Sequence, residues 1–310
     1  FNKDLRKKLS SVAFIEPPKI HQVHSSDEGT IKYVIELNSG SMVEMVIIPE
    51  KNRRTLCVSS QAGCALQCTF CATGAQGFDQ NLESNEIIGQ LWLANFNRNN
   101  TKPITNVVFM GMGEPLLNYD SVIESAKIMK DQLSYGLSRK RITISTSGIV
   151  PNINKLSKEI DVSLAISLHA AEDNLRNEIV PINKKYPIKS LIKACKEYLN
   201  YFDNKRNITI EYILIDGIND SIEHAKKLTK LLSDISCKIN LIPFNSFTGS
   251  DYKRPSNNKI NEFKKYLMSK GFIATLRITR GDGVDAACGQ LVGNLSNTIK
   301  GKNSISHKSI

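Results

Sequence analysis

Six short apolar segments, rich in β-branched residues, constrain the fold of this 310-residue chain more than any other feature. They lie at residues 55–60, 104–111, 141–148, 162–170, 208–215 and 237–244. Helical patterns fall between several of them, at residues 84–96, 119–133, 188–202 and 221–235, the first with Ser84 as the expected N-cap. Strands that alternate with helices predict an α/β protein with a parallel sheet, either an open barrel or a doubly wound fold. In both folds the chemistry gathers at the carboxyl ends of the strands.

The two ends of the chain predict smaller additions to this sheet. The segments "TIKYVIEL" and "SMVEMVII" flank Asn38-Ser39-Gly40, which predicts a β-hairpin before the barrel. The segment "NTIKGKNSISHKSI" has little to bury and predicts a flexible basic tail. We therefore expect an N-terminal accessory region with the hairpin at 1–49, the barrel at 50–295 and the tail at 296–310. The chain begins with Phe1 rather than Met, so we expect further sequence upstream.

Composition narrows the setting of the protein. No apolar run approaches the roughly 18 to 20 residues of a membrane span, and the first residues are too charged for a secretory signal. These features favour a cytoplasmic protein that does not enter a membrane. The formal net charge of +11 suits a polyanionic partner such as nucleic acid. Seven cysteines in a chain of this length favour metal binding or thiol chemistry over a disulfide scaffold.

Three of the seven cysteines form a compact motif in "GCALQCTFCATG". Cys64, Cys68 and Cys71 follow the first predicted strand with the spacing C-x3-C-x2-C. Such a loop of thiolates could hold zinc or an iron–sulfur cluster. Structural zinc normally needs a fourth ligand, and no second pair of cysteines follows nearby. Three ligands suit a [4Fe–4S] cluster with one open iron, and buried or zinc-bound cysteines are the alternative.

This motif, with Phe70 before the last cysteine, resembles the signature of the radical SAM superfamily. Longer segments resemble the RlmN/Cfr family of RNA methyltransferases from about residue 30 to 295, namely "CVSSQAGCALQCTFCATG", "FMGMGEPLLN", "ITISTSGIVP", "LAISLHA", "IEYILIDGIND", "INLIPFN" and "DAACGQL". The resemblance implies a radical SAM partial (β/α)6 barrel with a small N-terminal β element. It also implies a [4Fe–4S] cluster held by the three cysteines, two S-adenosylmethionine molecules per turnover, and methylation of an adenine ring carbon in 23S rRNA and tRNA.

The resemblance also assigns roles to residues outside the metal motif. Cys288 matches the cysteine that carries the methyl group, Cys57 the thiol that later releases the RNA by forming a disulfide, and Glu44 the proton acceptor. From the residues alone, Cys57 is a core residue of a strand, Cys288 a loop thiol and Glu44 a charge on an edge strand. Cys195 and Cys237 match no motif, so we expect them in the core.

Seven further residues match the family's S-adenosylmethionine contacts: Gly113, Glu114, Ser145, Ser167, Leu168, His169 and Asn245. For His169 the alternative is a structural histidine that bonds a neighbouring loop. The resemblance further implies a cytosolic electron donor and a monomer. Seven basic residues in short clusters could contact RNA phosphates: Arg53, Arg54, Arg139, Lys140, Arg141, Lys184 and Lys185.

Two other functions compete with methylation of adenine C2. A Cfr-type enzyme would methylate C8 with the same two cysteines, although "GEPLLN" and "INLIPFN" look more like the C2 branch. A non-catalytic RNA-binding protein could instead hold structural zinc, but it would need neither Cys57 nor Cys288. The chain also departs from the family by lacking most of an N-terminal helical domain that is associated with RNA binding.

Overall fold

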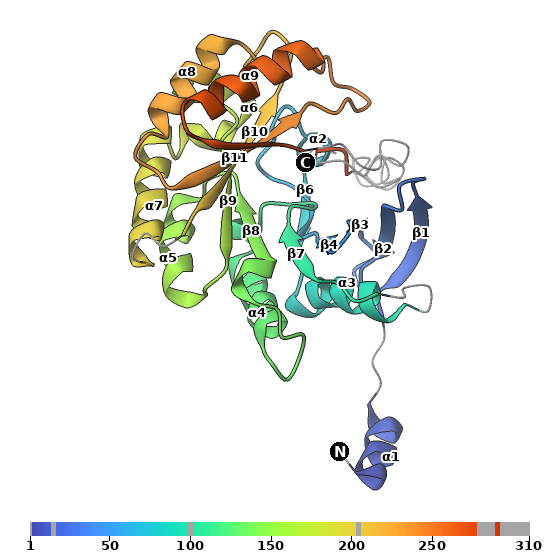
Figure 1. Ribbon diagram of the computed structural model, residues 1–310. Helices are drawn as coiled ribbons and strands as arrows, with labels where there is room; N and C mark the ends of the chain where they lie inside the picture. Colours follow the sequence, from blue (N-terminus) through green and yellow to red (C-terminus); the bar gives the residue numbers. More distant parts are fainter. Residues whose placement is uncertain (1, 14–16, 98–101, 203–205, 278–288, 292–310) are drawn as a thin grey trace, which may run out of the picture.

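The fold is built around one curved sheet of ten described strands (Figure 1). The computed structural model describes residues 2–13, 17–97, 102–202, 206–277 and 289–291. Along the sheet, the strands follow one another as β1 (Lys19–Ser25), β2 (Ile31–Glu36), β3 (Met42–Pro49), β4 (Arg54–Cys57), β7 (Asn106–Phe109), β8 (Ile142–Thr146), β9 (Ser163–Ser167), β10 (Ile208–Leu214), β11 (Cys237–Pro243) and β12 (Ile273–Leu276).

The strands from β4 to β12 form the parallel part of the sheet. Every neighbouring pair in this part is parallel, and the spatial order follows the order along the chain. A doubly wound sheet reverses its strand order at a switch point, whereas a barrel grows in one direction. The six predicted barrel strands are confirmed, and β12 adds a seventh that the sequence did not single out. The sheet stays open between β1 and β12, so the barrel is partial.

The predicted hairpin is confirmed and extends the barrel sheet. β2 and β3 pair antiparallel, and Gly40 takes the left-handed φ of 82° that their turn requires. β3 then pairs antiparallel with β4, with Val46 opposite Cys57. The hairpin therefore continues the wall of the barrel next to the first barrel strand.

Helices pack on the outside of the sheet, as Figure 1 shows for α5, α7, α8 and α9. The described α-helices are α1 (Lys3–Val12), α2 (Ala72–Gln76), α3 (Ser84–Phe96), α4 (Tyr119–Lys130), α5 (Val150–Glu159), α6 (Asp173–Ile179), α7 (Ile188–Tyr201), α8 (Ile222–Leu231) and α9 (Asn257–Ser269). The four predicted helices are present as α3, α4, α7 and α8. Their apolar faces and the outer face of the sheet enclose the main hydrophobic core.

The expected N-cap of α3 was wrong by one residue. Glu83 is the cap, because its backbone is extended at φ −73° and ψ 162°, and Ser84 is already helical. The backbone N–H of Glu83 donates to the carboxylate of Glu86 at 2.9 Å, which closes the first turn.

Three short 3-10 helices, η1 (Pro115–Leu117), η2 (Arg139–Arg141) and η3 (Pro181–Lys184), lie in the connections. A separate two-stranded sheet, β5 (Gln61–Gly63) and β6 (Phe78–Asn81), brackets the cysteine loop. Among the described residues, no helix is both long and apolar enough to cross a membrane. The predicted basic tail lies outside the described residues.

Candidate active site

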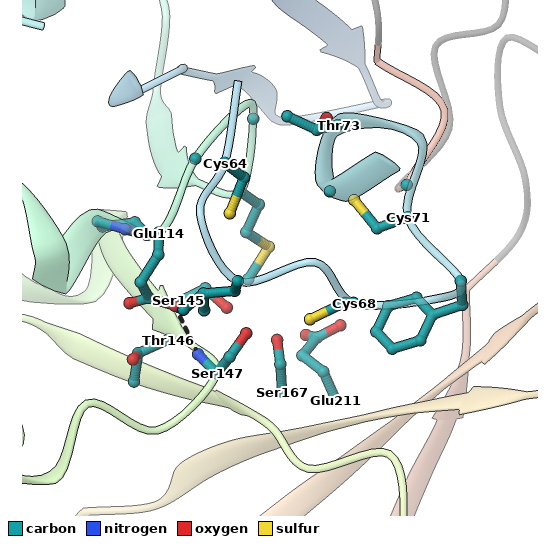
Figure 2. Close-up of a pocket in the computed structure, with 18 of the residues that line it drawn as sticks. Cys64, Cys68, Cys71, Thr73, Glu114, Ser145, Thr146, Ser147, Ser167 and Glu211 are labelled. Atoms are coloured by element: carbon teal, nitrogen blue, oxygen red, sulfur yellow. Dashed lines mark hydrogen bonds between the residues drawn. The ribbon is translucent and has the colours of Figure 1, made fainter. Parts of the chain in front are cut away.

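A cavity of about 140 Å³ lies at the carboxyl ends of the parallel strands. The cysteine loop forms one wall, and residues at the ends of β7, β8, β9, β10 and β11 form the others. Figure 2 shows the polar side chains that converge there from segments far apart in the sequence. The strands are parallel and successive, so their carboxyl ends meet at one edge of the barrel. The cavity therefore occupies the position at which barrel enzymes carry out their chemistry.

The three motif cysteines surround this cavity. The loop between β5 and α2 carries Cys64, Cys68 and Cys71, and all three line the cavity (Figure 2). The backbone N–H of Cys64 donates to the carbonyl of Gly77 at 2.8 Å, and that of Cys71 donates to Cys68 at 3.1 Å. The loop is thus held by its own backbone, and all three cysteines are free thiols.

Burial sets the protonation state of these thiols. It raises the pKa of Cys64 to about 12 and also raises the pKa of Cys68 and Cys71, because a thiolate loses hydration inside the protein. A bound metal centre reverses this balance, since its positive charge stabilises the thiolate. The site is therefore suited to thiolate ligands only together with a metal centre.

The donor set fits a [4Fe–4S] cluster. A cubane takes one thiolate on each of its irons, so its cysteines are spread around the cluster rather than directed at one point. The three cysteines line different parts of one cavity, and within the described ranges no three His, Cys, Asp or Glu side chains are placed to hold a single ion. Cys64, Cys68 and Cys71 would hold three irons of such a cluster and would leave one iron free to bind a small molecule.

Glu114 places a carboxyl group in the wall of the cavity, close to Cys64 (Figure 2). One carboxyl oxygen accepts from the N–H of Ser147 at 2.8 Å and the other from the N–H of Leu116 at 3.0 Å. Burial raises the pKa of Glu114, and these two hydrogen bonds oppose that rise. Two fixed N–H donors hold the carboxyl group in place, so it can accept a hydrogen bond from the amino group of a ligand.

Gly113 allows the chain to reach this position. Its φ of +98° is left-handed, and a Cβ atom there would lie only 2.4 Å from the Cβ of Gln61. The side chain of Gln61 in turn accepts the backbone N–H of Glu114 at 2.8 Å. Glycine is therefore required at position 113 for two reasons. The backbone has a left-handed φ, and the side chain of Gln61 leaves no room for a Cβ atom.

His169 contributes a neutral imidazole to the cavity. Its Nδ1 accepts the backbone N–H of Ile213 at 3.0 Å, which places the ring proton on Nε2. Burial, assisted by the positive charge of Arg176, lowers the pKa of His169 to about 3. The ring also packs edge-on against Phe70 at 4.6 Å between centroids. The histidine thus bonds a neighbouring strand, as the structural alternative predicted, and it also lines the cavity; its contact with S-adenosylmethionine stays a prediction.

The predicted cofactor contacts divide into two groups. Gly113, Glu114, Ser145, Ser167 and His169 line the cavity together with the cysteines. Two do not. Leu168 is buried behind the wall. Asn245 follows the carboxyl end of β11 and lines a second cavity of about 520 Å³ in the barrel interior, which shares Glu211 and Ile242 with the first.

Comparison with known proteins assigns this site to a family. The Radical SAM superfamily profile matches residues 58–229, which include the cysteine motif and most of the barrel. The chain is 56% identical over 303 residues to the "Dual-specificity RNA methyltransferase RlmN" of Pseudomonas putida, a match that covers 96% of this chain and 80% of that protein. The protein of the same name from Pseudomonas entomophila is 55% identical over the same shares. The chain belongs to the RlmN family of radical SAM enzymes.

A solved structure agrees with this family. A radical SAM methyltransferase from Sphaerobacter thermophilus superposes with a TM-score of 0.88 and 41% identity, over 94% of this chain and 86% of that one. TYW1 shares the fold at a TM-score of 0.52 and 16% identity, over 87% and 90% of the two chains. Membership of the RlmN family favours the radical SAM enzyme over a zinc-holding RNA-binding protein, and the RlmN branch over the Cfr branch.

In this RlmN-family chain, Glu44 forms a buried ion pair. Its carboxylate lies 3.3 Å from the Nζ of Lys32 on the neighbouring strand β2, and both side chains are less than a tenth exposed. The alternative that Glu44 is an edge-strand charge is wrong, because β3 lies between β2 and β4. Lys32 was missed, although it interrupts an apolar strand in the same way as Glu44 does.

Cys57 lies on the same face of the sheet as Glu44. Val46 is the register partner of Cys57, and Glu44 is two residues from Val46, so the pleat directs all three to one side. Cys57 is 5% exposed. Cys288 lies outside the described residues, but Gly289 after it lines the cavity and accepts the N–H of Ala72 at 2.7 Å.

Cys195 and Cys237 lie apart from the cavity of this radical SAM chain, as predicted. Cys195 is completely buried in α7, and Cys237 begins β11 at the opposite end from the site. Burial raises the pKa of both thiols to about 12. Cys195 is thus confirmed in the core, whereas Cys237 is only partly buried against it, and both thiols are suited as controls for thiol chemistry.

Sequence reasoning missed the polar residues that assemble the site. Glu211 lines the cavity from within β10 and accepts hydrogen bonds from Asn240 at 3.2 Å. Asn219 and Arg176 are completely buried and tie strand ends together. The sequence signal for Glu211 was a carboxylate inside the apolar segment "ITIEYILI". Asn219, in a turn, and Arg176, in α6, carried no local signal.

The predicted RNA-contacting residues lie in different surroundings. Arg53 and Lys140 line the second cavity, together with Lys238 and Arg277. Arg54 instead donates to the carbonyl of Lys102 and supports the start of the barrel. The second cavity therefore gathers only part of the predicted basic set.

Proposed function

We propose that this chain transfers a methyl group from S-adenosylmethionine to C2 of an adenine in 23S rRNA and in tRNA. The observation that supports it most is the convergence of the three cysteines with Glu114 on one cavity, in a chain 56% identical to dual-specificity RNA methyltransferases named RlmN. The net charge of +11 suits an RNA substrate. The RlmN relatives favour C2 over the Cfr-type C8 position.

The target carbon explains the need for this kind of site. Adenine C2 lies between two electron-withdrawing ring nitrogens, so it is not a nucleophile and cannot take a methyl group directly from a sulfonium ion. When bound by Cys64, Cys68 and Cys71, an iron–sulfur cluster supplies the electron that cleaves S-adenosylmethionine into a carbon radical. The protein contributes the position and the surroundings of the cofactor.

The residues of the cavity bind and orient S-adenosylmethionine. The carboxyl group of Glu114 accepts from the amino group of the cofactor, held for this by the N–H groups of Ser147 and Leu116. Ser145 and Ser167 offer hydroxyl groups, and His169 offers a ring N–H because its Nδ1 is already an acceptor. The binding site is thus prearranged by hydrogen bonds within the protein.

Cys288 carries the methyl group and Cys57 releases the product. Glu44 removes the proton from the adducted ring carbon. Lys32 beside it, 3.3 Å away, forms a buried ion pair that holds this carboxyl group in position. The thiolate of Cys57 attacks the sulfur of Cys288 and a disulfide forms between them; the carbon–sulfur bond breaks with its electron pair going to the carbon, which takes up a proton and becomes the methyl group.

Further expectations concern the setting of the reaction. We propose that two S-adenosylmethionine molecules are used in each turnover, one as methyl donor to Cys288 and one as radical source. A cytosolic electron donor, a monomeric state and a cytoplasmic location stay predictions from the family resemblance.

The test compares the two catalytic thiols under anaerobic conditions. Protein reconstituted with iron and sulfide should hold about four irons per chain and methylate RNA, as measured by mass spectrometry of the nucleosides. Cys288→Ala should yield neither methylated protein nor an adduct with RNA. Cys57→Ala should still add to the base and then accumulate as a protein–RNA crosslink that survives denaturation.

Cys237→Ala is the matched control, because it removes a cysteine at the far end of β11. It should methylate RNA at the wild-type rate without a crosslink. Normal methylated product from Cys57→Ala, with no crosslink, would overturn the proposed role of the two thiols. Stoichiometric zinc in place of iron after anaerobic reconstitution would overturn the radical chemistry.

A further inference from the structure

Arg176 is an arginine with no exposed surface, in the short helix α6 beside the cavity. Its Nε donates to the carbonyl of Leu168 at 2.9 Å, and its Nη2 donates to the carbonyls of Ser147 at 2.6 Å and Ser167 at 3.0 Å. Its Nη1 donates to the side chain of Asn183 at 2.8 Å. Four of the five N–H groups of this fixed fork thus bond neutral acceptors.

The carbonyls that Arg176 binds belong to the segments that form the cofactor wall. Ser147 follows β8, and its own N–H holds the carboxyl group of Glu114. Ser167 ends β9 and lines the cavity, and Leu168 precedes His169. One guanidinium therefore fixes the backbone at two neighbouring strand ends.

The same helix also contacts the cysteine loop. The carbonyl of Ile179, at the end of α6, accepts the N–H of Thr69 at 3.2 Å, and Thr69 follows Cys68 directly. The helix therefore links the loop that carries the metal ligands to the strand ends that carry the cofactor contacts.

The charge of Arg176 lies beside the cavity that the three cysteines line, because its guanidinium donates to the carbonyl of Ser167, which lines the same cavity. Burial lowers the pKa of Arg176 to about 10, so the side chain stays protonated at neutral pH. Its hydrogen-bond network reaches carboxyl groups only indirectly, Asp173 through Asn183 and Glu114 through Ser147. A buried cation is costly unless nearby negative charge offsets it, and three thiolate ligands supply such charge.

We propose that Arg176 is a positioning residue of the cofactor site, whose fork fixes the ends of β8 and β9 and whose charge stabilises the reduced form of the bound iron–sulfur cluster. An added electron makes the cluster more negative, and a cation in a low-dielectric interior favours that state. This inference rests on the proposed function, because it requires the cluster that Cys64, Cys68 and Cys71 would hold.

Two substitutions separate the charge from the geometry. Arg176→Met removes both, whereas Arg176→Lys keeps the charge but loses the planar fork. The first measurement is the midpoint potential of the cluster in anaerobically reconstituted protein without S-adenosylmethionine. The second is the Kd of S-adenosylmethionine by equilibrium dialysis.

We expect Arg176→Met to lower the midpoint potential by about 59 mV or more, which is a tenfold loss in the one-electron reduction equilibrium. We expect Arg176→Lys to keep the potential near that of the wild type. Both variants should raise the Kd of S-adenosylmethionine at least tenfold, because neither holds all the strand-end carbonyls.

Arg206→Met is the matched control. Arg206 is also largely buried, but it pairs with Asp161 at 2.6 Å and packs on Phe202, at the other end of the barrel. This variant should change neither the potential nor the Kd. If Arg176→Met fails to fold, Arg176→Gln, which keeps an amide donor but no charge, replaces it in the potential measurement.

Each half of the inference has its own refutation. An unchanged potential in the uncharged variant overturns the role of the charge, and a wild-type Kd in Arg176→Lys overturns the role of the fork. Failure of the proposed function looks different, since the wild-type protein itself would then hold no iron–sulfur cluster.

Discussion

Asn219 joins the ends of two parallel strands through one completely buried side chain, and its removal should destabilise the protein strongly. Its Nδ2 donates to the carbonyls of His169 at 2.9 Å and Ile213 at 2.6 Å. Its Oδ1 accepts the N–H of Ile215 at 2.8 Å. Asn219→Ala deletes all three hydrogen bonds at once and leaves three buried backbone groups without this partner.

The size of the effect follows from that count. A buried polar group that loses its partner costs about 1–3 kcal/mol, so three groups cost about 3 kcal/mol at the lower limit. For a chain of this size, roughly 2 °C of melting temperature corresponds to 1 kcal/mol. We therefore expect the melting temperature of Asn219→Ala to fall by about 6 °C or more.

The assay is thermal unfolding of cofactor-free protein, followed by circular dichroism at fixed pH and scan rate. Asn257→Ala serves as the control, because Asn257 is an exposed residue in the first turn of α9. It should change stability by no more than about 0.5 kcal/mol. A loss below about 1 kcal/mol for Asn219→Ala would show that the three hydrogen bonds do not hold the strand ends together.

Two further predictions concern the cavity wall. Gly113→Ala should weaken S-adenosylmethionine binding at least tenfold in equilibrium dialysis, because its Cβ would meet Gln61 at 2.4 Å; Gly217→Ala, with a similar positive φ but open space, should bind normally. His169 is neutral in the fold, with its pKa lowered from 6.5 to about 3, so its contribution to stability is complete above pH 6.5 and falls as the pH drops. Between pH 7 and 5 this costs about 2 kcal/mol, and denaturant titrations of His169→Asn should show a pH-dependent loss smaller by that amount; equal losses in both proteins would contradict the buried neutral histidine.

Much of the fold could be predicted because its signals are local. The β-branched segments and the helical patterns between them each carry their own periodicity, so the barrel strands and α3, α4, α7 and α8 were found from the sequence. β12 was missed because it is short and lies at the edge of the sheet, where Ile273 is 63% exposed. An apolar pattern in the sequence reveals a strand only where the side chains of that strand are buried.

The same limit applies to the site. The spacing of Cys64, Cys68 and Cys71 is local, so the sequence by itself determined the cysteine loop and, through family resemblance, the kind of chemistry. Glu114, Ser167 and His169 end strands, and parallel topology brings such positions to one edge, where the structure places them around a single cavity.

Only the tertiary structure decided what holds these groups in place. Arg176 binds carbonyls 8 to 29 residues away, and Lys32 meets Glu44 only through the register of two antiparallel strands. Backbone carbonyls are present at every residue, so nothing in the sequence marks the ones that a buried arginine will bind. Partner choice in such contacts depends on which chain segments the folded barrel brings together, and this information is absent from local patterns.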